Sequence, residues 1–219
     1  MGFDAKKQKD DEYYADIVDK WEKAANLDHW HAWTSFVLGG GQPSIDQSID
    51  RQLTQLSKWL LSRVWPECYT ELESAFSNFL RVANDFCNVF HKHTETSSSD
   101  HVYTRKFYQI EEWNPQLYSK LSKQYDHHVD LVQDLLLELT RAANLVCDRV
   151  RKDLMPSYRL EEGRLLVSSG PTMDLKIHTF SPQYSREEKE LERPYPGLEK
   201  FMDVRERRDI RFGKGPAPS

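Results

Sequence analysis

The chain has 219 residues, enough for one domain or two small ones, and a formal net charge of −5. Phosphate recognition needs a basic surface, so this charge argues against nucleic-acid binding as the main function. Hydrophobic residues make up 38% of the chain and aromatic residues 12%, which excludes a wholly disordered protein and allows a sizeable core. Apolar runs such as residues 135–137 are only a few residues long, so we expect no membrane-spanning helix.

The three cysteines, Cys68, Cys87 and Cys147, indicate a reducing compartment. Their number is odd and no two form a C-x-x-C pair, which argues against a disulfide framework or a cysteine zinc site. The first residues are rich in lysine and acidic side chains and contain no apolar segment, so no secretory signal is visible. We therefore expect a soluble cytoplasmic protein.

Helical periodicity predicts several amphipathic helices within residues 1–156. The first covers about residues 10–25, and a shorter one, capped by Asp28, ends at glycines 39–41. Ser44 and Gln47 form a Ser-x-x-Gln capping box, which predicts that the third helix begins at Ser44. The apolar face of the first helix consists of Tyr14, Ile17, Val18, Trp21 and Ala25.

The most regular pattern lies between Tyr69 and Phe90, in a helix expected to cover residues 66–93. Apolar residues recur there in unbroken steps of three and four, which is typical of a helix that packs on another helix. Asn114 and Pro115 then predict the start of a last long helix that ends before Pro156. This helix would be about 60 Å long at ~1.5 Å per residue, and it needs a partner along most of its length.

The pattern changes after Pro156. Residues 158–160 and 164–167 predict a β-hairpin around Gly163, and residues 175–179 a third strand. The expected fold is thus mainly α: an antiparallel bundle of long amphipathic helices with a small C-terminal β appendage and a flexible tail. The predicted divisions are a helical bundle at 1–156, the appendage at 157–182, and at 183–219 a charged tail with a short helix near 198–204 and a disordered end. Residues 102–113 fit either a helix or an extended segment.

Histidines suggest a metal site only if they converge from different helices. The candidates are His31, His91, His93, His127 and His128. No H-E-x-x-H motif is present, and neighbouring histidines on one helix point apart. Surface or core histidines are therefore the favoured interpretation, and we expect no cofactor.

Nucleophilic catalysis has little support in the sequence. No G-x-S-x-G turn is present, and the glycines at 39–41 are not followed by the Lys and Ser or Thr of a phosphate loop. Cys87 and Cys147 lie beside apolar stripe residues and are expected in the core. Cys68 follows Pro66 at an expected helix start, where a thiol pKa can be lowered, although a structural role is favoured. The sequence therefore favours a protein that is not an enzyme.

Some residues are candidates for contacts with a partner. The aromatic group Trp30, Trp33 and Phe36 could form a binding surface, although its helical spacing favours the core. Arginines near the C-terminus alternate with Glu206 and Asp209, so a solvated face is favoured over nucleic-acid contact. The candidate interaction residues are Trp30, Trp33, Leu165, Val167, Phe201, Arg205, Arg207 and Arg208.

These observations favour a non-catalytic interaction protein or an accessory subunit of a larger intracellular assembly. It would bind a protein partner, or a second copy of itself, through helix faces and the C-terminal appendage, where exposed strand edges could accept a strand. One alternative is a metal-dependent hydrolase that uses the histidines. A second is weak nucleic-acid binding through the C-terminal arginines.

Overall fold

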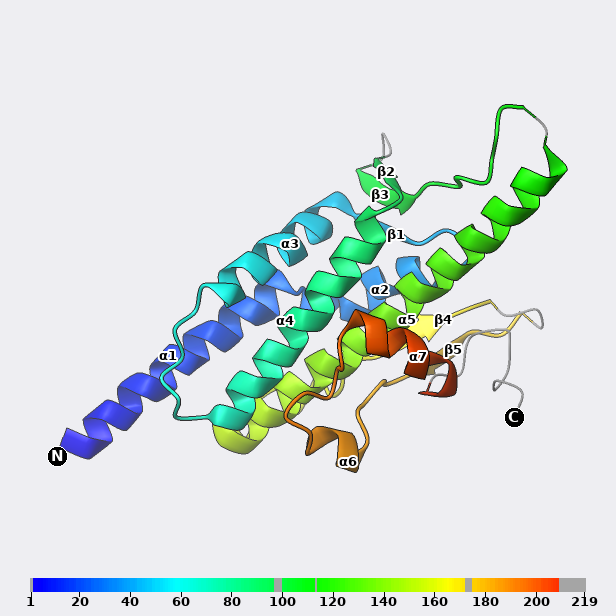
Figure 1. Ribbon diagram of the computed structural model, residues 1–219. Helices are drawn as coiled ribbons and strands as arrows, with labels where there is room; N and C mark the ends of the chain where they lie inside the picture. The colour runs from blue at the N-terminus through cyan, green and yellow to red at the C-terminus, as the bar shows by residue number, and fades with distance from the viewer. Residues whose placement is uncertain (1, 97–99, 113, 172–174, 209–219) are drawn as a thin grey trace.

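The computed structural model describes residues 2–96, 100–112, 114–171 and 175–208, and Figure 1 shows their arrangement. The described part of the chain is mainly helical, as expected, and contains two small antiparallel sheets. The helices are α1 (Gly2–Ala24), the 3₁₀ helix η1 (Leu27–His29), α2 (Trp30–Leu38), α3 (Gln47–Leu61), α4 (Thr70–His91), α5 (Pro115–Asp153), α6 (Arg186–Lys189) and α7 (Leu198–Arg208). The strands are β1 (Ser44–Asp46), β2 (Thr94–Thr96), β3 (His101–Thr104), β4 (Val167–Ser169) and β5 (His178–Phe180).

The apolar face predicted for the first helix, within residues 14–25, is buried. The ring of Trp21 lies edge-on to Phe76 and Phe79 of α4, with ring centroids 5.6 and 5.5 Å apart. Edge-to-face pairs of this kind add to the stabilisation that burial of the rings provides. The same spacing that identified the first helix therefore also identifies the side that packs on α4.

The predicted start of the third helix is wrong. Ser44 lies in β1, and α3 begins at Gln47 because Asp46, not Ser44, is its N-cap: the Asp46 carboxylate accepts a hydrogen bond from the Ser48 backbone N–H at 2.7 Å. The predicted helix start at Pro66 is also wrong. Glu67 has a φ of +62°, which a helix cannot contain, and α4 begins at Thr70.

Helices α4 and α5 pack against each other along the centre of the molecule (Figure 1). The regular stripe on α4 is buried as predicted, from Leu72 to Phe90. The start of α5 is confirmed as well, since the Asn114 side chain accepts a hydrogen bond from the Leu117 N–H at 3.0 Å. Near the other end of α5, Lys152 forms an ion pair with Glu71 of α4 at 2.7 Å.

A three-stranded sheet in the order β1-β3-β2 lies at the end of α4 and was not predicted. Strand β3 resolves part of the ambiguous segment 102–113 as extended, and its Val102 is buried. Because β3 pairs antiparallel with β2, the chain comes back beside the end of α4 before it continues to the start of α5.

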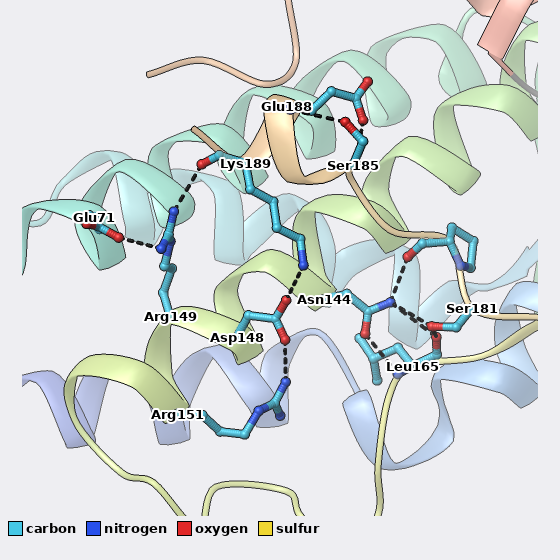
Figure 2. Close-up of polar contacts among 11 residues, drawn as sticks. Glu71, Asn144, Asp148, Arg149, Arg151, Leu165, Ser181, Ser185, Glu188 and Lys189 are labelled. Atoms are coloured by element: carbon cyan, nitrogen blue, oxygen red, sulfur yellow. Dashed lines mark hydrogen bonds and ion pairs between the residues drawn. The ribbon is translucent and has the colours of Figure 1, made fainter. Parts of the chain in front are cut away.

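The predicted hairpin around Gly163 is wrong. Residues 156–162 form turns, and the two-stranded sheet instead pairs β4 with β5. The reason is a side chain of α5: Asn144 accepts a hydrogen bond from the Leu165 N–H at 3.0 Å and donates one to the Leu165 carbonyl at 3.2 Å (Figure 2). These bonds occupy backbone groups of Leu165 that a hairpin would use.

The C-terminal segment packs on the same core as the helices. Tyr184 donates a hydrogen bond to Glu138 of α5 at 2.7 Å, and Tyr195 donates one to Asp85 of α4 at 2.7 Å. The predicted short helix is present as α7, and its Phe201 is fully buried. The predicted disordered end at 213–219 lies outside the described residues.

Candidate binding groove

A cleft of about 980 Å³ lies where the end of α4, the segment after β3, the first half of α5 and α7 meet. Three of the predicted metal-site histidines line it, so we call it the histidine groove. Its lining consists of Asn88, Val89, Lys92, His93, Arg105, Phe107, Leu121, Lys123, Gln124, His127, His128, Leu131, Leu198 and Met202.

Local structure explains why these residues meet. Helix α4 ends at His91, and the backbone N–H of Arg105 donates to the His93 carbonyl at 2.8 Å, which holds the segment after β3 beside the end of α4. Phe107 follows, with its ring centroid 4.4 Å from that of His93. The residues that α5 contributes include positions 121, 124, 128 and 131, which share one face of a helix. The first turns of α5 extend beyond the other helices (Figure 1).

His128 is the most buried of the groove histidines, with 7% of its surface exposed. Its ring lies edge-on to that of His93 at a centroid distance of 5.0 Å. Its Nε2 atom is buried and has no hydrogen-bonding partner within the described residues. Burial, and after it the charges of His93 and Lys92, lower the pKa of His128 to about 4. His128 is therefore neutral at pH 7.

The described lining of the groove contains three cations and no carboxylate. Arg105 pairs with Glu95 at 3.6 Å, whereas the structure gives no ion pair for Lys92 or Lys123 in the described part of the chain. The pKa of His93 is lowered by burial and then by the charges of Lys92 and Arg105. The groove is thus electropositive in a chain whose net charge is −5.

The five candidate metal ligands lie in three separate places. His93, His127 and His128 line the groove. His31 hydrogen-bonds to Ser168 of β4 at 2.7 Å, and His91 pairs with Asp50 of α3 at 2.7 Å, which raises the pKa of His91. Among the described residues, no group of three or more His, Cys, Asp or Glu side chains is arranged to hold a metal ion.

The apolar candidates for partner contacts are buried in the core. Trp30 donates a hydrogen bond to Thr140 of α5 at 3.2 Å, and the ring of Trp33 packs edge-on to that of Trp30. The core interpretation is therefore confirmed for the two tryptophans, whereas it is wrong for Phe36, which is 57% exposed. Leu165, Val167 and Phe201 are buried as well, because the C-terminal segment packs on α5 and α2 instead of projecting from the body. These five side chains are not on the surface that a partner would meet.

Arg205 does not lie on the solvated face that the sequence suggests for the C-terminal arginines. Arg205 is 2% exposed, and its guanidinium lies 2.5 Å from the carboxylate of Asp134 on α5. It therefore contributes nothing to an exposed basic surface for nucleic acid. The side chains of Arg207 and Arg208 lie outside the described residues.

A second cleft, of about 460 Å³, lies between the start of α4, the end of α5 and the segment around α6. Its cations are all paired within the chain. Arg149 and Lys152 both pair with Glu71. Lys189 pairs with Asp148 at 2.7 Å, and Figure 2 shows this pair and the one between Arg149 and Glu71. The pairs with Glu71 join α4 to α5, and the pair between Lys189 and Asp148 fastens the C-terminal segment to α5. The histidine groove is therefore the stronger candidate for ligand binding.

Several groove residues could not be singled out from the sequence. Arg105 and Phe107 lie in the segment whose structure was ambiguous, and Lys92 and Lys123 resemble ordinary surface lysines. The paired histidines were the one usable signal, since His93, His127 and His128 all line the groove.

The three thiols are expected to differ sharply in reactivity. Cys68 is exposed, whereas Cys87 and Cys147 are buried, and burial raises the pKa of both to about 12. Ellman's reagent should therefore modify one thiol per chain in the native protein and all three after denaturation. Modification of more than one thiol in the native state would contradict this burial.

The Cys68 thiol itself is not activated by a helix N-terminus, because its Sγ donates to the Asp10 carboxylate at 3.3 Å. This hydrogen bond raises the pKa of Cys68. An Asp10→Asn variant should therefore react faster at Cys68 than the parent protein. Glu162→Gln, at an exposed acid in the turns after α5, is the control and should leave the rate unchanged.

No helix within the described ranges is long and apolar enough to cross a membrane. No protein-family model, curated protein or solved structure matches the chain.

Proposed function

We propose that this chain is a non-catalytic interaction protein, an adaptor or accessory subunit, that holds a segment of a partner protein in the histidine groove. In this proposal the long helices act as an antiparallel bundle that supports the groove. The observation that carries the proposal is the groove itself, a large cleft with apolar walls and a cationic edge. Metal-dependent hydrolysis and nucleic-acid binding are not proposed, because the histidines lie in three places and Arg205 is buried.

Apolar side chains from every element of the groove support this proposal. They are Val89 of α4, Phe107, Leu121 and Leu131 of α5, and Leu198 and Met202 of α7. On the projecting turns of α5, Leu117 and Tyr118 are 42% and 37% exposed. Contiguous apolar surface with a polar edge is typical of sites that bind another protein.

A photo-crosslinking amino acid at Gln124 tests the proposal. This position is exposed on the groove side of α5, and Lys58, exposed on α3, gives a control position outside the groove. In the native cells, we expect a covalent adduct of defined mass from position 124 and none from position 58.

A Leu121→Glu variant places a carboxylate among the apolar groove residues and should abolish the adduct. Leu61→Glu, at a side chain 74% exposed on α3, is the matched control and should leave the adduct unchanged. Circular dichroism establishes that both variants are folded. An adduct at position 124 that survives Leu121→Glu, or equal adducts from both crosslinker positions, would exclude the groove as the binding site.

A further inference from the structure

The charge of the histidine groove differs in sign from that of the whole chain. Lys92, Arg105 and Lys123 line it without any described Asp or Glu, although the chain carries five more acidic than basic residues. Binding partners present charges complementary to the surface that they cover, since a like charge at the edge of an interface is repelled. A segment that fits this groove is therefore acidic on the sides that face the lysines.

The groove is short along α5. Along α5 it extends from Leu121 to Leu131, which corresponds to roughly 15 Å at 1.5 Å per residue. A helix of this length and of about 10 Å diameter, three turns long, occupies roughly 1,200 Å³. That is close to the 980 Å³ of the cleft, so a helix of three turns fills it and rises above its edge.

An extended segment fits the groove less well. Ten extended residues span roughly 33 Å, and they need a sheet edge for their backbone hydrogen bonds. None of the described groove residues lies in a strand, since β3 ends at Thr104, before Arg105. A helix satisfies its own backbone groups and presents apolar side chains on one face, which matches the apolar walls of the groove.

His128 adds a polar position among these apolar side chains. Only 7% of its surface is exposed, and its buried Nε2 has no partner in the described part of the chain. From these observations we infer that the partner segment is an acidic amphipathic α-helix of about three turns. This inference rests on the proposed function, that the groove holds a protein segment.

Synthetic helices test the inference directly on the full-length protein. The probe is a fluorescent peptide of about 14 residues, with leucines at i, i+3, i+7 and i+10 and glutamates on its other faces. A second peptide has lysine in place of each glutamate, and a third has the composition of the first in an order without an apolar face. Fluorescence anisotropy should show that the acidic amphipathic peptide binds at least roughly tenfold more tightly than either of the others.

Charge reversal in the protein should reverse this preference. The double variant Lys92→Glu and Lys123→Glu is expected to bind the acidic peptide roughly tenfold or more weakly than the parent protein does, and to bind the lysine peptide more tightly. The matched control is Lys9→Glu combined with Lys58→Glu, which changes the net charge equally at exposed residues outside the groove. It should leave the preference intact.

Equal binding of the three peptides, or equal effects of the two double variants, would overturn the inference. If the adduct forms at position 124 but the protein does not prefer the acidic peptide, the inference is overturned while the proposed function stands. Absence of that adduct would overturn both, because the inference depends on a protein segment in the groove.

Discussion

The free energy of unfolding of an Arg205→Met variant is expected to be about 3 to 5 kcal/mol lower than that of the parent protein. The guanidinium of Arg205 lies 2.5 Å from the Asp134 carboxylate, and the two side chains are only 2% and 5% exposed. Methionine retains most of the apolar stem of arginine but removes a buried positive charge that pairs with the Asp134 carboxylate. Urea unfolding at pH 7 measures the loss.

Two comparisons separate this effect from a general loss of packing. Adding Asp134→Leu to Arg205→Met should recover much of the stability, because a buried ion pair can be replaced by apolar side chains at little cost. Lys20→Met removes the exposed pair between Lys20 and Asp16 and should cost less than about 1 kcal/mol. If Arg205→Met costs no more than Lys20→Met, the buried pair does not hold α7 in place.

The same pair connects stability to the groove. Arg205 lies on α7, the helix that contributes Leu198 and Met202 to the lining. A chain in which α7 is loosened should therefore bind the acidic helix more weakly, even though Arg205 itself does not line the groove.

The parts of the fold that sequence reasoning predicted well depend on local, periodic signals. The buried stripe of α4 and the start of α5 at Asn114 and Pro115 required only the spacing of apolar residues and one cap. The errors arose where a distant contact overrides a local pattern. Asn144 holds Leu165 from a position 21 residues away in the chain, and no pattern within 158–167 reports that bond.

The groove could be predicted only in fragments. Its lining residues range from Asn88 to Met202, and the histidine pairs gave no sign that His93 and His128 would meet with ring centroids 5.0 Å apart. The charge pattern of the sequence was misleading about Arg205, because its contact is also with a residue distant in the chain. Arg205 stands among charged residues and resembles a surface position, whereas the fold places it opposite Asp134 in the interior.

Lowering the pH from 7 to 4 should destabilise the protein through His128 by about 3 kcal/mol. Its pKa is about 4 in the folded chain, against the usual 6.5 for an exposed histidine in the unfolded chain. Between these two pH values His128 is protonated in the unfolded chain but not in the folded chain. The free energy of unfolding therefore falls as the pH drops from about 6.5 to about 4, and then levels off. A His128→Leu variant lacks this contribution, and urea unfolding across this pH range measures it.

The difference in unfolding free energy between the two proteins isolates His128 from other titrating groups. The groups that face it are His93 and Lys92 at the end of α4, Arg105 after β3 and His127 on α5, and all of them remain in the variant. His91, whose pKa is raised by Asp50, has the opposite pH dependence and cancels in the comparison. The control is His29→Leu, at an exposed position in η1. A difference between His128→Leu and the parent that does not change with pH would mean that His128 is accessible to solvent and protons, and the apolar interior of the groove would then have to be hydrated.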